Sequence, residues 1–84
     1  MHEHGLMTKL LKQASGEAAA RGGELRCIRV RLGAMATSDE EHFRGDFEHV
    51  REELGMHPIT LEVEMAPDHP AGVELLSIEV GTEG

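Results

Sequence analysis

The sequence predicts a two-layer α+β domain in which two amphipathic helices cover one face of a three-stranded sheet. Two segments place apolar residues at helical spacing, and three segments alternate apolar and polar residues. The expected order is helix, strand, helix, strand, strand, with a sheet that is mostly antiparallel or mixed. A sheet with one apolar face must be covered on that face. The 84 residues are sufficient for one such domain, spanning 1–84.

The first helix is expected over residues 6–20. The alanine run from Ala18 to Ala20 has high helix propensity, and Gly22 and Gly23 end the helix. The spacing of the apolar residues places one stripe of side chains toward the core. This stripe consists of Leu6, Met7, Leu10, Leu11, Ala14 and Ala18.

The second helix is expected over residues 39–54. Ser38 can cap its start, and Glu41 lies three residues further on, which is the spacing of a capping box. Acidic residues in the first turn suit the positive end of the helix dipole, and Gly55 is a natural stop. The apolar face consists of Phe43, Phe47, Val50 and Leu54.

Two of the three expected strands, over residues 25–32 and 59–65, have one apolar face and one polar, solvent-exposed face, which we call the wet face. The wet face carries Arg29 and Arg31 in one strand and Glu62 and Glu64 in the other. These charges would share one sheet face if the strands are neighbours. The apolar faces consist of Ile28, Val30 and Leu32 in the first strand and Ile59, Leu61, Val63 and Met65 in the second.

The third strand is expected over residues 73–80. Its apolar register shifts between Leu75 and Leu76, which indicates a bulge or a strand with two apolar sides. The composition of residues 67–72 is typical of a turn, so we expect the last two strands to form an antiparallel hairpin. The direction of the first strand relative to the second stays open, because a helix joins them.

Composition argues against several classes of function. The net charge is −8, with 8 Lys and Arg against 16 Asp and Glu, which leaves no basic footprint for a nucleic acid. We see no membrane span and no signal peptide, and we expect a cytoplasmic protein. The single cysteine, Cys27, allows no intrachain disulfide and no CxxC pair, and we expect an inert thiol at an outward or edge position. No nucleophile with a paired base is visible, so we do not expect an enzyme.

The start of the chain carries the most informative chemistry. His2 is flanked by the amine of Met1 and by main-chain amides, and an imidazole there can chelate a metal together with main-chain nitrogens. Nitrogen ligands suit nickel(II), although copper would bind as readily. Because the amides must lose protons, such binding would depend on pH. From the residues alone, His2 and His4 equally fit solvent-facing histidines that bind nothing.

The other histidines and the methionines have more ordinary interpretations. His42, Asp46 and His49 share a helix face that could hold a surface metal, but a solvated flank is the favoured interpretation. His57 and His69 are expected to be exposed in loops. Packing in the core or against loops, rather than binding of a soft metal, is expected for Met7, Met35, Met56 and Met65.

The order of short motifs resembles the nickel-binding domain of the HypA/HybF family of nickel-incorporation proteins. The similar segments cover nearly the whole chain in order. The start is the most specific of them, because the family requires it at residue one. The segments are Met1-His2-Glu3, Ile28 to Gly33, Asp39 to Phe47, Leu61-Glu62-Val63 with Pro67 after it, and Ser77 to Val80.

This resemblance implies a nickel site at the chain start. In the HypA family the histidine after the initiator methionine is an essential nickel ligand, which implies the same role for His2. The main-chain nitrogens of His2 and Glu3 would complete much of the site. The Met1 amine and His4 are further candidate ligands. The side chain of Glu3 is implied as a supporting or partner-contacting group.

The resemblance further implies a non-enzymatic metallochaperone that delivers Ni²⁺ to a maturing NiFe hydrogenase or urease. Its partners would be a HypB-type GTPase and the precursor of the nickel enzyme. HypA proteins insert a zinc domain with two CxxC pairs between the last two strands, where this chain has only Asp68 to Gly72, so no zinc is expected. The alternative is a metal-free, HypA-like protein-interaction module. The oligomeric state stays open, a homo-oligomer included.

Overall fold

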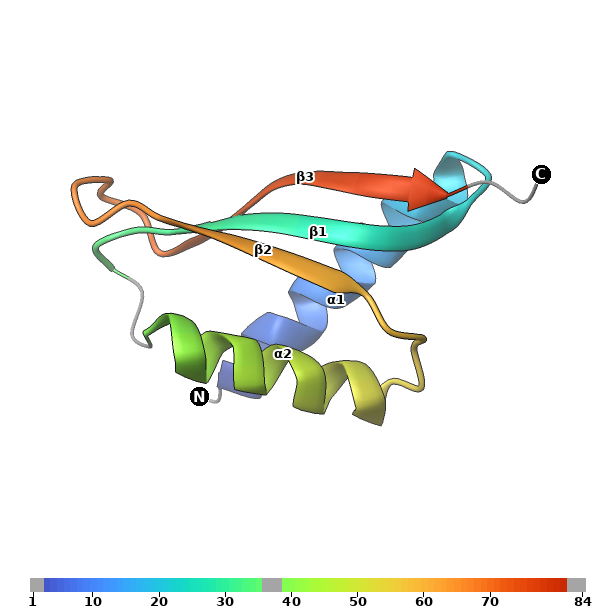
Figure 1. Ribbon diagram of the computed structural model, residues 1–84, viewed down its shortest axis with the longest axis horizontal. Coiled ribbons are helices and arrows are strands. Elements are labelled where there is room, and N and C mark those ends of the chain that lie inside the picture. The colour runs from blue at the N-terminus through green and yellow to red at the C-terminus, as the bar shows by residue number, and fades with distance from the viewer. Residues whose placement is uncertain (1–2, 36–38, 82–84) are drawn as a thin grey trace.

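The computed structural model describes residues 3–35 and 39–81, and its elements follow the expected order (Figure 1). Both helices lie on the same face of a three-stranded sheet, which confirms the predicted two-layer α+β fold. None of the helices in these two ranges is long and apolar enough to cross a membrane. The elements are α1 (Glu3–Ala20), β1 (Glu24–Leu32), α2 (Glu40–Glu53), β2 (Thr60–Met65) and β3 (Val73–Gly81).

The central strand is β1, because the strand order is β2-β1-β3. β1 runs parallel to β2, since α2 forms a crossover between them, and antiparallel to β3, so the sheet is mixed. The register pairs Arg29 with Glu62 and Arg31 with Glu64, at nitrogen–oxygen distances of 3.0 Å and 3.2 Å. The expected sharing of one wet face by these four residues is therefore confirmed.

The predicted hairpin between the last two strands is wrong. β2 and β3 flank β1 instead of pairing with each other, and the loop that joins them crosses the carboxyl end of β1 (Figure 1). This arrangement gives main-chain partners to both edges of β1, the strand whose side chains are buried most completely. β3 has the predicted irregularity, because Ser77 pairs with Arg29 and Leu75 with Val30, which leaves one extra residue between them.

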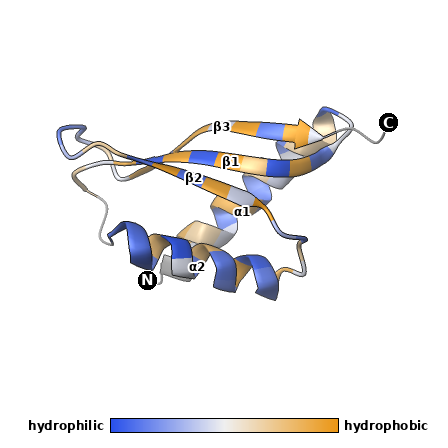
Figure 2. Ribbon diagram, in the orientation of Figure 1, coloured by the Kyte–Doolittle hydropathy of each residue, from blue (hydrophilic) through white to orange (hydrophobic). Residues whose placement is uncertain are grey.

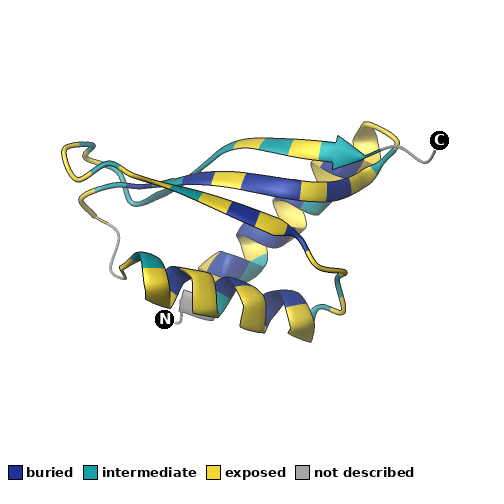
Figure 3. Ribbon diagram, viewed as in Figure 1, coloured by how far each residue is buried: buried dark blue, intermediate teal, exposed yellow. Residues whose placement is uncertain are grey.

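The core lies between the apolar face of β1 and the two helices. Ile28, Val30, Leu11 and Phe47 have no solvent-exposed surface, and Phe43 is 5 % exposed. Along β1, hydropathy and burial largely alternate together (Figures 2 and 3). Burying one large apolar side chain stabilises a fold by roughly 1.5–3 kcal/mol. Since a domain has a net stability of only about 5–15 kcal/mol, each of these side chains is important.

α1 begins at Glu3, before the predicted start at residue 6. Its apolar stripe is buried as predicted, except that Leu6 is 54 % exposed because it lies at the rim of the helix–sheet contact. The predicted glycine stop is confirmed. Gly22 adopts a positive φ of 77°, and the N–H of Gly23 donates to the carbonyl of Ala18 at 3.1 Å, as in a Schellman motif.

α2 begins at Glu40, and its N-cap is Asp39. The predicted cap, Ser38, lies outside the described residues. The carboxylate of Asp39 accepts a hydrogen bond from the main-chain N–H of His42 at 2.8 Å, and this bond lowers the pKa of Asp39. At the other end, Gly55 has a positive φ of 71°, as expected for a helix stop. Arg51 donates to the carbonyl of Met56 at 2.6 Å and secures the last turn.

Two methionines expected to pack are exposed instead. Met65 is 51 % exposed and Met35 is 69 % exposed, whereas Met7 is buried and Met56 packs against the core. β2 diverges from α2 toward its carboxyl end, so the helix does not cover Met65 although the alternation directs it to the helix side (Figure 1). The sheet twist thus limits how far the alternation of an edge strand predicts burial.

The β2–β3 loop closes tightly over the end of β1. The N–H of Gly33 donates to the carbonyl of Gly72 at 2.8 Å, and the N–H of Ala34 donates to the carbonyl of His69 at 2.8 Å. A Cβ atom on Gly33 would overlap the carbonyl of Ala71 and would lie 2.8 Å from that of His69. The close approach of the two main chains therefore requires glycine at this position.

We expect Gly33→Ala to lower the free energy of unfolding by about 1–3 kcal/mol, because the loop must move away from the added methyl group. Gly16→Ala is the matched control, since Gly16 is exposed in α1 and a Cβ atom there meets nothing within 4 Å. That change should raise the free energy of unfolding by about 0.5–1 kcal/mol. Urea unfolding followed by circular dichroism measures both. Equal effects would show that the loop does not constrain Gly33.

Asp39→Ala should lower the melting temperature at neutral pH by a few degrees, because α2 loses its cap. The pKa of Asp39 is lowered in the folded chain. The ionised cap therefore stabilises the fold above the ordinary pKa of aspartate, and this contribution is lost as the pH falls through the folded-state pKa. The difference between wild type and variant should shrink below about pH 4. Thermal unfolding at several pH values measures this difference in melting temperature. Asp39→Asn is the control, because asparagine can cap the helix but does not titrate. A difference between wild type and Asp39→Ala that persists in acid would contradict the assignment of ionised Asp39 as the cap.

Candidate metal centre at the start of the first helix

The predicted metal ligands lie at and just before the first turn of α1. The structure places the main chain of Glu3 and His4 in that turn. Met1 and His2 lie outside the described residues, and so do the side chains of Glu3 and His4. The geometry of this centre therefore comes from the main chain that directly follows His2.

Main-chain N–H groups at the start of α1 are free of helix hydrogen bonds. The first four N–H groups of an α-helix have no carbonyl one turn earlier to donate to, and in α1 this set begins at Glu3. A nitrogen here can lose its proton to a metal without breaking a bond of the helix. The positive end of the helix dipole repels a bare cation but stabilises a deprotonated amide nitrogen. Two such nitrogens cancel the charge of a divalent ion, so this position suits a metal–amide complex.

α1 carries this end of the chain to the side of α2 (Figure 1). The amino-terminal half of α1 packs beside α2, where Met7 and Leu11 share one core cluster with Phe43 and Phe47. The carboxyl half lies beneath the sheet. The exposed surface of α2 is acidic. The first turn of α1 therefore lies beside an acidic surface, and such a surface favours cations.

The remaining four histidines have other neighbours. Nδ1 of His42 lies 3.2 Å from the carboxylate of Asp39, and Nε2 of His49 lies 3.3 Å from that of Glu53. His57 donates from Nε2 to a main-chain carbonyl of β1 at 2.7 Å. Across the described residues, no group of three or more His, Cys, Asp or Glu side chains is placed to hold a metal ion. On the flank of α2, a carboxylate thus lies beside each of the two histidines, Asp39 beside His42 and Glu53 beside His49.

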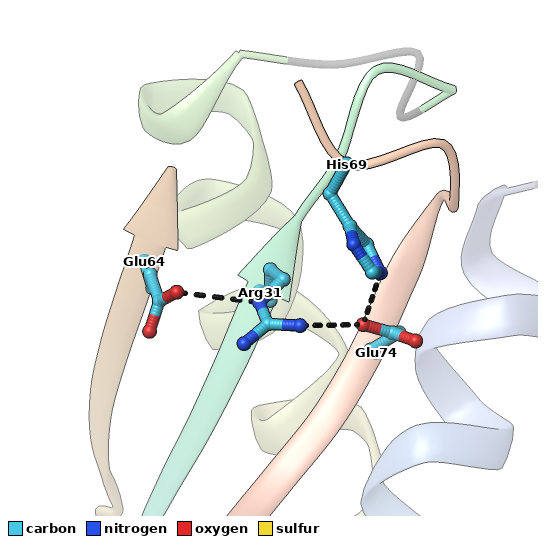
Figure 4. A network of polar contacts seen from close by, with 4 residues as sticks. All are labelled: Arg31, Glu64, His69 and Glu74. Carbon is cyan, nitrogen blue, oxygen red and sulfur yellow. Dashed lines mark hydrogen bonds and ion pairs between the residues drawn. The ribbon is translucent and has the colours of Figure 1, made fainter. Parts of the chain in front are cut away.

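A polar network fastens the β2–β3 loop to the wet face of the sheet (Figure 4). The guanidinium of Arg31 lies 3.2 Å from the carboxylate of Glu64 and 3.4 Å from that of Glu74. Nε2 of His69, in the loop, lies 3.0 Å from the same Glu74 carboxylate. His69, which was expected to be exposed, is partly buried by these contacts. The sequence could have indicated this network only with the strand order known, because Glu74 meets Arg31 only when β3 is next to β1.

Cys27 lies on the wet face of β1 but is only 7 % exposed. It shares a small hollow with Glu62 and Glu79. Burial raises the pKa of the Cys27 thiol, and the negative charges of Glu62 and Glu79 raise it further. Since the thiolate is the nucleophile and the metal ligand, a raised pKa weakens both roles. The side chain therefore has the surroundings of an unreactive thiol, at the outward position that the alternation predicted.

We expect the thiol of Cys27 to react with Ellman's reagent at least about tenfold more slowly in the folded chain than in the same chain unfolded in urea. The reaction requires a thiolate and access, and the folded chain restricts both. Glu79→Gln should increase the folded-state rate, because it removes a negative charge that raises the thiol pKa. Glu53→Gln, on the exposed surface of α2, is the control for an equal change of net charge. A folded rate equal to the unfolded rate would contradict this description.

A scan against models of protein families finds no match, and neither does a search of curated protein sequences. Among solved structures, the chain matches the solution structure of the Ni metallochaperone HypA from Helicobacter pylori with a TM-score of 0.77. The two sequences are 19 % identical, and the match covers 99 % of this chain and 100 % of that one. At this identity the likeness shows the fold alone. The chain therefore shares its fold with a Ni metallochaperone.

Proposed function

We propose that this chain is a nickel-binding accessory protein of the metallochaperone type. It holds Ni²⁺ at His2 and passes the ion to the precursor of a nickel enzyme, a NiFe hydrogenase or a urease. The main support is the start of α1 at Glu3, which leaves unpaired main-chain N–H groups directly after His2. The fold shared with a Ni metallochaperone supports the same function.

The proposed ligands are the imidazole of His2 and the main-chain nitrogens of His2 and Glu3. The Met1 amine or the imidazole of His4 supplies a fourth ligand. Such a set is all nitrogen, which suits the square-planar preference of nickel(II). An ion bound by deprotonated amides is released when those amides regain protons or when a partner offers competing ligands. Reversible binding of this kind fits a carrier of nickel better than a permanent metal centre.

Delivery requires partners, and we place a HypB-type GTPase and the enzyme precursor in that role. The first described side chain after the proposed ligands, Leu6, is 54 % exposed. A partner can therefore approach the ion without an opening of the fold. No zinc is part of the proposal, because the β2–β3 loop contains no cysteine.

The central experiment is isothermal titration of nickel(II) into the untagged chain and into His2→Ala. Loss of a second-shell partner alone weakens metal affinity by about 10- to 100-fold, so loss of the His2 ligand should cost at least that much. His42→Ala is the matched control, since it removes an exposed imidazole from α2 and should leave the affinity unchanged. Affinity should also fall as the pH is lowered, because the imidazole and the amides must be deprotonated to bind.

Equal tight binding by the wild type and His2→Ala would rule out His2 as the ligand. Absence of nickel binding by the wild type would favour a second candidate function, a metal-free interaction module of HypA-like fold. For that candidate, two surfaces could bind a partner protein. The exposed side of α2 is acidic, and the edge of β3 is uncovered. An extension added before Met1 separates the candidates, because it should abolish nickel binding in the first case and leave partner binding intact in the second.

A further inference from the structure

Two lysines in the first half of α1 differ from the other cations of the chain. Every arginine lies within 3.9 Å of a carboxylate oxygen. Among the residues that the structure describes, Lys9 and Lys12 have no such ion pair. The sequence gives the reason, because no acidic residue stands three or four positions before or after either lysine on the helix. Both side chains are exposed to solvent.

These two charges serve neither helix stability nor the binding of nickel. A lysine without a carboxylate one turn away adds no ion pair to the helix. Lys9 lies about 9 Å along the helix axis from Glu3, at a rise of about 1.5 Å per residue, and a positive charge at that distance opposes a bound cation. The charge of Lys9 is therefore available to a carboxylate outside this chain.

Lys9 borders a groove between the amino-terminal half of α1 and the first half of β3. The groove encloses about 750 Å³. Leu6 and Leu10, one helical turn apart, give it an apolar lining on the helix side, and Leu6 is 54 % exposed. Leu75 and Leu76 line it on the strand side. An apolar lining beside an unpaired cation suits a ligand that has both apolar and acidic groups.

The other charges that line the groove balance one another. The carboxylate of Glu74 lies 3.4 Å from the guanidinium of Arg31 and 3.0 Å from Nε2 of His69 (Figure 4). Lys9 is the remaining charged residue of the lining, so the groove is locally positive. The exposed surface of α2 is acidic and repels a negatively charged segment. Charge therefore directs such a segment to the groove and away from α2.

We infer that this groove binds an amphipathic helix of a partner protein, which places apolar side chains between α1 and β3 and carboxylates beside Lys9 and Lys12. Because Leu6 and Leu10 are one turn apart, apolar side chains on successive turns of the partner can pack against them. The groove begins at Leu6, within about one turn of Glu3. The partner is therefore the protein that receives the nickel ion, a point that rests on the proposed function.

A second copy of this chain does not supply that helix. Its acidic helix, α2, already packs its apolar face in its own core through Phe43, Phe47 and Val50. Each copy also carries a net charge of −8, and repulsion between the copies opposes association. The partner helix is therefore part of another protein. Because the groove is short and exposed ion pairs contribute little, we expect a dissociation constant of about 10 μM to 1 mM.

Titration of the ¹⁵N-labelled chain with synthetic peptides, in EDTA and without nickel, tests the groove independently of metal binding. The probe is a helical peptide with leucines on one face and glutamates beside them. A matched peptide carries lysines in place of the glutamates. The glutamate peptide should shift the amide signals of residues 6–13 and 73–76, and the lysine peptide should leave those signals unchanged.

Three charge-reversing variants locate the contact. Lys9→Glu should weaken binding of the glutamate peptide by roughly 2- to 30-fold, because an attractive pair becomes repulsive. Lys12→Glu should have a smaller effect, since Lys12 does not line the groove. Arg21→Glu makes the same change of charge just after the carboxyl end of α1 and should have no effect. Leu6→Ala should also weaken binding, and circular dichroism checks that each variant folds.

Three results would overturn the inference. The first is that the glutamate peptide shifts none of these amides, and the second is that the lysine peptide shifts them equally. The third is that Arg21→Glu weakens binding as much as Lys9→Glu does, because net charge and not the groove would then decide. Amide shifts that depend on the concentration of the chain without peptide would show a second copy in the groove and overturn it too. None of these results bears on nickel binding by His2, which the titration of His2→Ala tests separately.

Discussion

The apolar face of β1 packs on both helices, and the positions of the other elements depend on that contact. Ile28 and Val30 have no solvent exposure, and they pack in one cluster with Leu11 of α1 and Phe47 of α2. A strand buried on one face has to satisfy its main chain on both edges, and here β2 and β3 supply the partners. The parallel crossover through α2 and the loop over the end of β1 follow from this central position.

The same packing determines where the first turn of α1 lies. The buried stripe of α1 holds the helix against β1 and α2 from Met7 onward, so its first turn is presented at a constant place on the surface. The turn itself buries no side chain that the structure describes, which leaves its N–H groups available. Under the proposed function, neither the sheet nor α2 would have to change for an ion to be bound or released.

The sequence predicted those features of the fold that depend on local patterns of apolar and polar residues, namely the helices and the strands. The alternation of apolar and polar residues predicts a strand with one apolar face at Ile28, Val30 and Leu32. The four-residue spacing of Phe43 and Phe47 predicts the apolar face of a helix. The fold class could therefore be predicted before the structure. Which strands are neighbours depends on packing between distant segments. The contact of Glu74 with Arg31 was therefore not visible in either segment alone.

For the candidate site, the sequence supplied the residue type and its position in the chain, and the helix boundary came from the structure. Residues 2–5 are polar or small and show no apolar period, so the pattern gave no reason to extend the helix to Glu3. The cap of α2 illustrates the same limit, since both Ser38 and Asp39 are good N-cap residues and only the hydrogen bond to His42 distinguishes them. Local propensity identifies the residue types that can begin or end a helix. The hydrogen bonds of the folded chain then determine which of the candidate residues is the cap.

The connection between β2 and β3 has a consequence for how such chains can evolve. Each of the two strands is aligned by β1, so the tip of the connection between them determines no strand register. Extra chain can enter or leave at that tip without displacing the strands, provided that Gly33 keeps its close approach to the returning main chain. The loop is thus a natural boundary for gaining or losing a module while the rest of the architecture is inherited intact.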